Sequence, residues 1–440
     1  MKTIFAISTP QIQSAISLFR ISGPETKKLL DYFQIKNKII PRTTHLVKLK
    51  LPCDTILDHC ILIYFSQNYS FTGEEVIELH THGSIAIQKT LTHHLSKLFQ
   101  HAEPGEFTRQ AVLNKRMNLI EAEGLHDLIT SYTWEQHKQA INQMQGILYK
   151  KCKNWKQKLI ELLTQIEGYI NFEDEAPKNI FNIINTQINE INKLLQNAID
   201  DKQQGLIIKD GINIGIFGNP NSGKSTLMNK LTLKNTSIIS NIPGTTTDII
   251  TTHIDFNGYP IILYDTAGIR KNSNNTIEKM GINKSLELIK KIHIKIIIID
   301  ITTYEIEQEI IDNIDKNTII LLNKADLKHN NKKLLTIEKA YTYKKISILK
   351  DDIQHILNPI GEIIKKLAPN QESAQITQER HYKKLNNTIN ILQKIPKNCQ
   401  DLSIIANILY LAINEIAELI DKIDDEDILN NIFKNFCIGK

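Results

Sequence analysis

The spacing of apolar residues changes along the chain, and the first stretch predicts an α+β domain. From residue 3 to about residue 115, short apolar runs such as Ile4 to Ile7, Ile61 to Phe65 and Val76 to Leu79 alternate with Pro, Gly and polar turns. Short apolar runs bounded by turn residues are typical of strands. Together with interspersed helical segments they indicate a mixed domain with its own core.

Helical periodicity dominates two later stretches of the chain. Between Leu119 and about Ile170, and again from Leu402 to Ile420, apolar residues recur three or four positions apart. This spacing places them on one face of a helix and predicts long packed helices. From about Gly205 to Leu367, strand-like runs alternate with helical segments, which predicts a doubly wound parallel sheet.

The simplest arrangement is a multidomain chain in which an α/β domain is inserted into an all-α domain whose two halves pack together. The predicted boundaries are 1–116 for the α+β domain, 117–205 plus 368–440 for the helical domain, and 206–367 for the inserted domain. The chain has 440 residues, more than one core usually serves, so several domains are expected.

Composition indicates the setting of the protein more than its chemistry. The 53 basic and 48 acidic residues give a net charge of +5, too small to establish a polyanionic partner. No stretch reaches roughly 18 uninterrupted apolar residues, so we expect a cytoplasmic protein without a membrane span. The cysteines are scattered without a metal-binding spacing, which favours a reducing compartment: Cys53, Cys60, Cys152, Cys399 and Cys437.

The segment Gly218-Asn219-Pro220-Asn221-Ser222-Gly223-Lys224-Ser225 fits the phosphate-binding pattern G-x-x-x-x-G-K-[ST]. It lies between the apolar run Ile212 to Phe217 and a helical stretch from Thr226, the context that this motif requires. The glycines let backbone N–H groups face phosphate oxygens, and the helix adds the positive end of its dipole. We expect Lys224 to neutralise the β and γ phosphates and Ser225 to offer its hydroxyl to Mg²⁺.

Three further segments complete a guanine nucleotide site. Asp265-Thr266-Ala267-Gly268 ends a strand-like run, so its carboxylate can reach Mg²⁺ through water and the Gly268 N–H can meet the γ-phosphate. Asn323-Lys324-Ala325-Asp326 ends another run, and the Asp326 carboxylate can accept guanine N1–H and the exocyclic amine, which selects GTP. Gly244-Thr245-Thr246-Thr247-Asp248 supplies hydroxyls where a switch loop would lie, and Thr246 is the predicted second Mg²⁺ ligand.

The residue after Gly268 constrains how GTP is hydrolysed. In Ras-like GTPases a glutamine there orients the attacking water, whereas Ile269 cannot hydrogen-bond to water. Glu278 is the first carboxylate after Asp265 and is our candidate for holding the water. The other interpretation of Glu278, a solvated helix residue, stays open.

Motifs outside the nucleotide site resemble one family. The order GNPNSGKST, IPGTTTD, DTAG and NKAD, in a chain ending Phe436-Cys437-Ile438-Gly439-Lys440, is similar to the MnmE (TrmE) family of tRNA-modification GTPases. The segments FTGEEVIEL at 71–79 and EPGEFTR at 103–109 resemble the family's FTGEDxxEL and PGEFTxRA, and LIEAE at 119–123 its LxxAEA helix start. The resemblance covers essentially the whole chain.

This resemblance implies an N-terminal folate-binding and dimerising domain, a helical domain and an inserted G domain. It implies a homodimer that, with the flavoprotein MnmG, modifies carbon 5 of the wobble uridine of certain tRNAs with a folate one-carbon unit, such as that of 5-formyltetrahydrofolate. Glu278 falls in the family's E-x-x-G element, Glu278 to Gly281, and would be catalytic.

The resemblance also implies ligand sets. A potassium ion would be coordinated by Asn221, Ser240, Ile242 and Thr245, and the folate pocket would contain Arg20, Glu78, Arg116 and Lys440. Cys437 is a possible functional thiol, or else a small buried hydrophobe. The residues expected to bind GTP are Asn221, Ser222, Gly223, Lys224, Ser225, Thr226, Ser240, Asn241, Ile242, Pro243, Gly244, Thr245, Thr246, Asp265, Thr266, Ala267, Gly268, Asn323, Lys324, Ala325, Asp326, Ser347, Ile348 and Leu349.

The chain departs from the family's pattern at several places. Arg116 replaces a lysine, which keeps the charge but changes the donor geometry, and Thr247 replaces the arginine of GTTRD. The segment Thr9 to Ala15 lacks the glycines of the family's TPxGxGA start, so this loop must form without glycine or differ in shape. The guanine-supporting SA[KL] loop is here Ser347-Ile348-Leu349, followed by Asp351-Asp352, so we expect base affinity to differ.

Two other functions stay open on the sequence. A ribosome-assembly GTPase would share the four motifs and add an RNA-binding appendage, although no RRM or KH-like motif is visible. A nucleotide-gated scaffold would use GTP only to control the pairing of helical domains. The histidines His80, His82, His93 and His94 lack a metal-binding spacing such as HExxH.

Overall fold

A computed structural model describes most of the chain. The described residues are 2–172, 176–200, 202–234, 237–238, 251–265, 291–303, 308–327, 342–368, 376–396, 401–420, 433–434 and 436–439. Their contacts divide into two compact units. The first comprises Met1–His126, Met144–Gln157 and Ile413–Lys440, and the second comprises Asp127–Gln143 and Lys158–Ala412.

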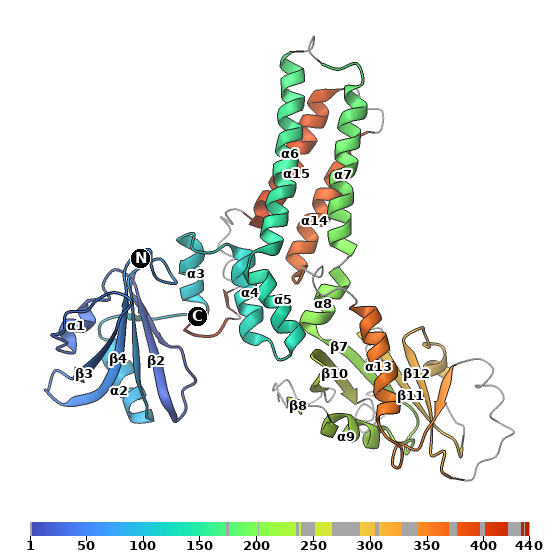
Figure 1. Cartoon of the computed structure of the whole chain (residues 1–440), viewed down its shortest axis with the longest axis horizontal. Coiled ribbons are helices and arrows are strands. Elements are labelled where there is room, and N and C mark those ends of the chain that lie inside the picture. Colours follow the sequence, from blue (N-terminus) through green and yellow to red (C-terminus); the bar gives the residue numbers. More distant parts are fainter. Residues whose placement is uncertain are drawn as a thin grey trace, which may run out of the picture. The chain divides into compact units, whose positions relative to one another are not determined.

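The first unit is built on a six-stranded sheet with the strand order β3-β4-β5-β2-β1-β6 (Figure 1). Its first elements are β1 (Ile4–Ile7), β2 (Ser14–Ser22), α1 (Lys28–Tyr32), β3 (Thr44–Lys50), β4 (Ile56–Phe65), β5 (Val76–Gly83), α2 (Ile85–Leu95), β6 (Gln100–His101) and α3 (Glu106–Leu113). Neighbouring strands are antiparallel except β6, which is parallel to β1. The predicted α+β domain is confirmed.

One face of this sheet carries the core of the first unit. Strand residues such as Phe19, Leu62 and Leu79 are fully buried and belong to one cluster with Leu91 and Leu95 of α2. Residues on either side of a buried position point to the other face, because side chains alternate along a strand. Arg20 of β2 and Glu78 of β5 therefore lie together on the second face.

The loop before β2 forms without glycine. Residues 9–15, all of them described, adopt no left-handed backbone conformation. The Gln88 side chain donates a hydrogen bond of 3.1 Å to the Ile12 carbonyl, and the Leu18 N–H donates one of 3.2 Å to the Thr9 hydroxyl. This loop thus forms with side-chain contacts and without glycine.

Long helices follow the first sheet and return near the end of the chain, as predicted. They are α4 (Leu119–Thr130), α5 (Trp134–Met144), α6 (Ile147–Asn171), α7 (Ile180–Asp200), α8 (Lys202–Asp210), α14 (Glu379–Leu392) and α15 (Leu402–Ile420). Within the second unit, α7 packs against α14 although almost two hundred residues separate them (Figure 1). The buried residues of α7, including Ile180, Ile184, Ile188 and Ile191, recur every three or four positions.

Helix α15 is long and apolar enough to cross a membrane by length and composition, and in the described part of the chain it alone passes that test. Its Leu409, Ala412 and Ile416 are buried against other parts of the protein. Core helices of water-soluble proteins pass the same test. This finding is therefore weak evidence for a span.

The inserted part of the second unit is a seven-stranded sheet with the order β13-β12-β11-β7-β10-β9-β8. Its elements are β7 (Ile212–Phe217), α9 (Lys224–Lys234), β8 (Ser237–Ile238), β9 (Thr251–Phe256), β10 (Tyr259–Asp265), β11 (Ile294–Asp300), α11 (Gln308–Ile311), β12 (Thr318–Asn323), β13 (Tyr343–Lys345) and α13 (Gln354–Leu367). The strands β10, β7, β11, β12 and β13 run parallel to one another. At one edge, β9 is antiparallel to β10, and β8 is antiparallel to β9.

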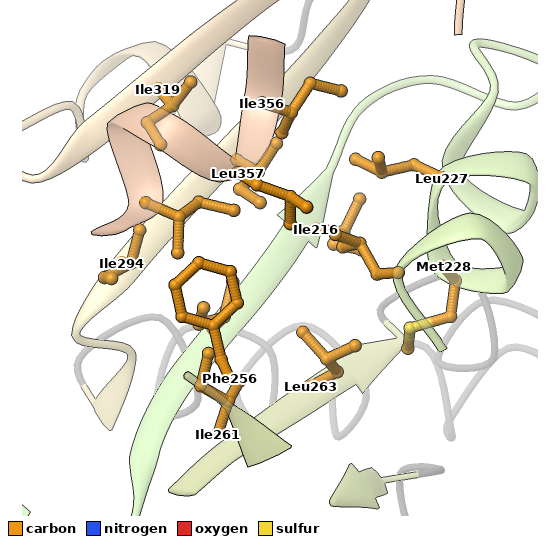
Figure 2. Close-up of a cluster of buried hydrophobic side chains, with 14 of the residues drawn as sticks. Ile216, Leu227, Met228, Phe256, Ile261, Leu263, Ile294, Ile319, Ile356 and Leu357 are labelled. Carbon is orange, nitrogen blue, oxygen red and sulfur yellow. The ribbon is translucent and has the colours of Figure 1, made fainter. Parts of the chain in front are cut away.

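Both faces of this sheet are covered, which explains why its central strands are almost entirely apolar. Figure 2 shows the core on one face, where Leu227 and Met228 of α9 and Ile356 and Leu357 of α13 lie over strand residues such as Ile216. The opposite face buries Phe217, Ile297, Ile299, Ile320 and Leu322. The predicted doubly wound parallel sheet is confirmed.

Among the described residues of the second unit, the inserted sheet contacts the helices at places that include the following two. At the first, the chain enters and leaves the insert side by side, because a Cβ on Gly205 would lie 2.3 Å from the Ile376 carbonyl oxygen. At the second, the Glu135 N–H of α5 donates a hydrogen bond of 3.0 Å to the carbonyl of Gly258, in the β9–β10 turn.

Candidate functional site

The loop Gly218–Gly223 lies at the carboxyl end of β7, the central strand of the inserted sheet. Neighbouring strands β10 and β11 lead away from β7 to opposite sides, and this switch point is where ligands bind in such sheets. Gly218 has φ 143°, and a Cβ there would lie 2.2 Å from the Ile298 carbonyl oxygen. Gly223 has φ 110°, and a Cβ there would lie 2.3 Å from Asn323 Nδ2. Both positions require glycine.

The side chains of this loop are arranged around the start of α9. Lys224 Nζ donates hydrogen bonds of 2.7 Å to the carbonyls of Gly218 and Asn219, which folds the loop over the lysine. Among the described residues, the buried Ser222 hydroxyl has no hydrogen-bond partner. The exposed Asn221 adopts φ 64°. N–H groups at the start of a helix and one ammonium form a site suited to phosphate.

Buried Asn323 joins the phosphate loop to a second loop. Its Nδ2 donates a hydrogen bond of 2.7 Å to the Ser222 carbonyl, and its Oδ1 accepts one of 2.9 Å from the Ile348 N–H. Only 5% of Asn323 is exposed, so both bonds are shielded from water. The structure thus brings together Ser222, Asn323 and Ile348, which the sequence placed in three separate motifs.

Two ion pairs flank Asn323. Lys324, at φ 63°, pairs with Asp300 at the end of β11. Burial raises the pKa of Asp300, but hydrogen bonds from Lys324 and Thr302 outweigh it and hold that pKa below its usual value. Asp326 Oδ2 lies 2.8 Å from Lys350 Nζ. Hydrogen bonds from the Lys350 and Ser347 side chains lower the pKa of Asp326, so this carboxylate is ionised at neutral pH.

Asp265 ends β10 beside the phosphate loop. Its Cα is paired in register with Ile216 of β7, one residue before the end of that strand. Asn323 is likewise paired with Asp300 at the ends of β12 and β11. The carboxyl ends of parallel strands share one edge of the sheet, and this is how separate motifs reach a common site.

A second polar cluster lies on the second face of the first unit's sheet, the face opposite its main core. Arg20 Nε donates a hydrogen bond of 2.9 Å to Glu78 Oε1, and one guanidinium nitrogen of Arg20 donates one of 3.1 Å to the Gly439 carbonyl. The Arg20 guanidinium carbon lies 5.9 Å from the ring centre of Phe71 and 5.8 Å from that of Phe107. The side chains of Arg20 and Glu78 are 13% and 16% exposed. This cluster is a partly buried arginine–carboxylate pair between aromatic rings.

The other residues predicted for the folate pocket are less tightly grouped. Arg116 is exposed and lies over Gly73, where a Cβ would be 3.1 Å from Arg116 Cγ.

Cys437 is an exposed free thiol, and its carbonyl accepts a hydrogen bond of 3.5 Å from the Gly105 N–H. The buried alternative for Cys437 is wrong. His82 is paired with Asp58 at 2.7 Å, and no metal-binding group of His, Cys, Asp or Glu occurs in the described part of the chain.

Comparison with known proteins decides the family. The sequence pattern described as the MnmE helical domain matches residues 119–437, and that of the GTP-binding protein TrmE N-terminus matches residues 3–116. The chain belongs to the MnmE family of tRNA modification GTPases. Residues 3–116 and 119–437 together leave almost none of the chain outside these two patterns.

Relatives of this MnmE-family chain are similar over their whole length. A tRNA modification GTPase MnmE from Rickettsia bellii is 39% identical over 451 residues, covering 100% of both chains. Those from Orientia tsutsugamushi and Ehrlichia chaffeensis are 39% and 38% identical, covering 100% of this chain and 99% and 100% of theirs. The solved G domain of the T. maritima FeoB iron transporter covers 36% of this chain and 98% of its own, with 21% identity and a TM-score of 0.26, which is too low to carry an argument.

Several predicted site residues of this MnmE-family chain lie outside the described residues. They are Ser240, Asn241, Ile242, Pro243, Gly244, Thr245, Thr246, Thr247, Thr266, Ala267, Gly268, Glu278 and Lys440. Asp265 is described in its backbone only. The roles given to these residues stay predictions.

The structure also adds contacts that the sequence did not predict for the nucleotide site. Asp300 and Lys350 pair with Lys324 and Asp326, and Asp351 Oδ2 accepts a hydrogen bond of 2.7 Å from the Ser347 N–H. Asp300 ends a strand-like run, like Asp265 and Asn323, and this position was a usable signal. Lys350 had no such signal, because it follows a loop that departs from the family's motif.

Proposed function

We propose that this MnmE-family chain hydrolyses GTP and uses that cycle to modify carbon 5 of the wobble uridine in certain tRNAs. One observation carries the nucleotide part of the proposal. The phosphate loop after β7, the aspartate ending β10 and the motif after β12 meet at one edge of the sheet, and Asn323 joins two of them. Membership of a family of tRNA modification GTPases supports the tRNA part and disfavours the ribosome-assembly hypothesis.

Magnesium fits the chemistry of the phosphate loop. Ser225 is exposed in the first turn of α9, and its hydroxyl is a hard oxygen ligand of the kind that Mg²⁺ prefers. Ser225 and Thr246 would hold the ion, which would neutralise charge that develops on the phosphates. Lys224 would bind the β and γ phosphates, and Asp326 would accept the N1–H and amine of guanine.

Potassium is proposed as the second cation of the site. Asn221 is exposed at the turn of the phosphate loop, and its amide oxygen is a suitable ligand. Ser240, Ile242 and Thr245 would complete the coordination. The ion would supply the positive charge that an arginine finger gives elsewhere. Glu278 would hold the attacking water, since Ile269 cannot.

A folate is proposed to bind the polar cluster of the first unit. Arg20 and Glu78 present a cation and an anion within a partly buried setting, and Phe71 and Phe107 offer rings for stacking. Arg116 and Lys440 would add positive charge for the folate's carboxylates. The bound folate would supply the one-carbon unit, and Cys437 would lie near it because its carbonyl is bonded to Gly105.

A homodimer is proposed through the exposed part of the second face of the same sheet. Leu46, Ile61 and Ile16 are 72%, 41% and 57% exposed. Leu46 pairs in register with Ile61, so two exposed apolar side chains adjoin on neighbouring strands, and His80 follows Ile61 on the next strand. Apolar surface of this kind is stabilised when a second copy covers it. The flavoprotein MnmG and tRNA are the further proposed partners, in the cytoplasm.

GTP turnover in two salts tests the proposal. The purified full chain is assayed in potassium and in sodium at equal ionic strength, with Asn221→Lys and Glu278→Ala as variants. We expect turnover to rise strongly in potassium, and each variant to lower it by about 10-fold or more. GTP binding measured in parallel should survive in Glu278→Ala.

Other outcomes separate the parts of the proposal. Equal slow turnover in both salts contradicts the potassium-dependent cycle and favours the nucleotide-gated scaffold. Binding of 5-formyltetrahydrofolate that is unchanged by Arg20→Met contradicts the folate site alone. A monomer in solution contradicts the dimer proposed through the second face of the first unit's sheet.

A further inference from the structure

The loop after β13 places a lysine against the carboxylate proposed to recognise guanine. Lys350 Nζ lies 2.8 Å from Asp326 Oδ2, and the side chains of Lys350 and Asp326 are 69% and 25% exposed. Both residues border the base side of the nucleotide site, where Asn323 bonds to Ile348. The lysine follows directly on Ser347-Ile348-Leu349, the segment in which this chain departs from the family's motif.

This contact belongs to a hydrogen-bonded turn. The Lys350 and Asp351 N–H groups donate hydrogen bonds of 3.0 and 2.8 Å to the Ser347 carbonyl. Asp351 Oδ2 accepts one of 2.7 Å from the Ser347 N–H, and Lys230 Nζ donates one of 3.1 Å to the Leu349 carbonyl. These hydrogen bonds hold the backbone at Lys350, and the side chain extends from there to Asp326.

The chemistry of guanine makes this contact consequential. Guanine offers two donors on one edge, N1–H and the exocyclic amine, and a carboxylate binds both when both of its oxygens accept. Hypoxanthine has the N1–H but no amine, so it needs one oxygen only. Each carboxylate oxygen has two lone pairs. An ammonium on Oδ2 occupies one of them and so competes with the guanine edge for that oxygen.

We propose that Lys350 competes with the guanine edge for Asp326 Oδ2, which lowers the affinity for guanine nucleotides and narrows the preference for guanine over hypoxanthine. Lys350 is a positioning residue, because it acts through Asp326. This inference rests on the proposed function, in which Asp326 recognises guanine.

The size of the effect follows from the exposure of the pair. An exposed ion pair contributes little because water and salt screen it, so its removal changes affinity by about two- to five-fold. The competition weakens as salt rises. The affinity of the natural chain for GDP should therefore approach that of a variant without the lysine at high ionic strength.

Displacement of a fluorescent nucleotide by GDP and by IDP, on the full chain at low and high salt, tests the inference. Lys350→Met should bind GDP about two- to five-fold more tightly at low salt and bind IDP nearly unchanged, which raises the GDP-to-IDP preference. Lys350→Gln, also neutral, should reproduce this shift. Lys365→Met on α13 removes an equal charge from an exposed position of the same sheet domain and should change neither affinity.

The contrary outcomes are distinct. Unchanged or weaker GDP binding in both Lys350→Met and Lys350→Gln overturns the inference, and so does an equal gain for GDP and IDP. Asp326→Asn tests the function beneath it. If Asp326→Asn keeps its preference for GDP, guanine recognition by Asp326 fails together with the inference. If Asp326→Asn loses that preference while both Lys350 variants behave like the natural chain, only the lysine inference fails.

Discussion

The nucleotide site and the Arg20–Glu78 cluster are both polar sites at the edge or face of a sheet, but they are assembled differently. In the nucleotide site, each part is a contiguous motif at the end of a parallel strand, and Asn323 bonds to Ser222 across 101 residues. In the first unit, Arg20 lies opposite Glu78 in an antiparallel register and bonds to Gly439, which is 419 residues away.

This difference shows which kind of site can be predicted from a sequence. A parallel sheet brings the carboxyl ends of its strands to one edge, so a motif after each strand is enough to predict the meeting. The Arg20 cluster depends on strand register and on where the C-terminal residues lie. Single charged residues carry no local signature of such a meeting, and only the family resemblance pointed to them.

The largest expected effect is that of Gly223→Ala in the nucleotide site. The added Cβ would lie 2.3 Å from Asn323 Nδ2, at φ 110°. We expect a loss of about 3 kcal/mol or more in the free energy of unfolding, and loss of GTP binding. Urea unfolding measures the first quantity. Gly168→Ala on α6, where nothing lies within 4 Å of the Cβ, should instead stabilise by about 0.5–1 kcal/mol.

If Gly223→Ala and Gly168→Ala change the free energy of unfolding equally, the close approach of the phosphate loop to Asn323 does not stabilise the nucleotide site.

Asn323→Ala should have the next largest effect, because it removes both bonds that join the two loops. The Ser222 carbonyl and the Ile348 N–H would lose their partner in a buried place, at a cost of about 2 kcal/mol. Thermal or urea unfolding measures it. Asn358→Ala on α13, an exposed asparagine bonded to Gln354, should stay within about 0.5 kcal/mol of the natural chain. Equal values for the two variants would contradict a joining role for Asn323.

Arg20→Met tests the second site and should cost less, about 1–2 kcal/mol. The loss arises because the Glu78 side chain, 16% exposed, loses the guanidinium that pairs with it. In a double-mutant cycle with Glu78→Gln, the double variant should lose less free energy of unfolding than the sum of the two single losses. Lys28→Met, which breaks the exposed pair with Glu25, should have no measurable effect. Strict additivity of Arg20→Met and Glu78→Gln would show that the two residues do not act as a pair.

The smallest expected effect is a pH dependence at the start of β7. Burial lowers the pKa of His293, an effect that Asp210 partly offsets, and His293 Nδ1 accepts a hydrogen bond of 2.9 Å from the Asn213 N–H. The neutral ring is therefore favoured by folding. Its contribution is present above the unfolded pKa, about 6.5, and is lost as pH falls toward the lowered folded value, by less than about 1 kcal/mol.

Unfolding at about pH 7.5 and about pH 6 measures this dependence. His293→Asn keeps an acceptor for the Asn213 N–H and cannot titrate, so its stability should vary less over that range. Burial raises the pKa of Asp210, so its protonation opposes the trend at lower pH. A pH dependence equal in both proteins would assign the effect to other groups.

The architecture was largely predictable, and the residues explain why. Runs such as Ile294 to Ile299 are apolar throughout because both faces of the sheet are covered, and the spacing of Ile180, Ile184 and Ile188 is that of a helix with one buried face. The antiparallel additions β8 and β9 and the order of the strands were not predictable, because pairing partners leave no trace in the local pattern.

For the candidate site, the sequence by itself predicted which motifs bind phosphate and guanine, and it determined that glycines stand at positions 218 and 223. The local backbone conformation requires these residue types, so a short segment of sequence is enough to recognise them. Only the tertiary structure decided that Lys350 lies against Asp326, that Asp300 holds Lys324, and that Gly439 meets Arg20. Contacts between distant side chains depend on the sum of packing and register over the whole fold, and no single segment encodes them.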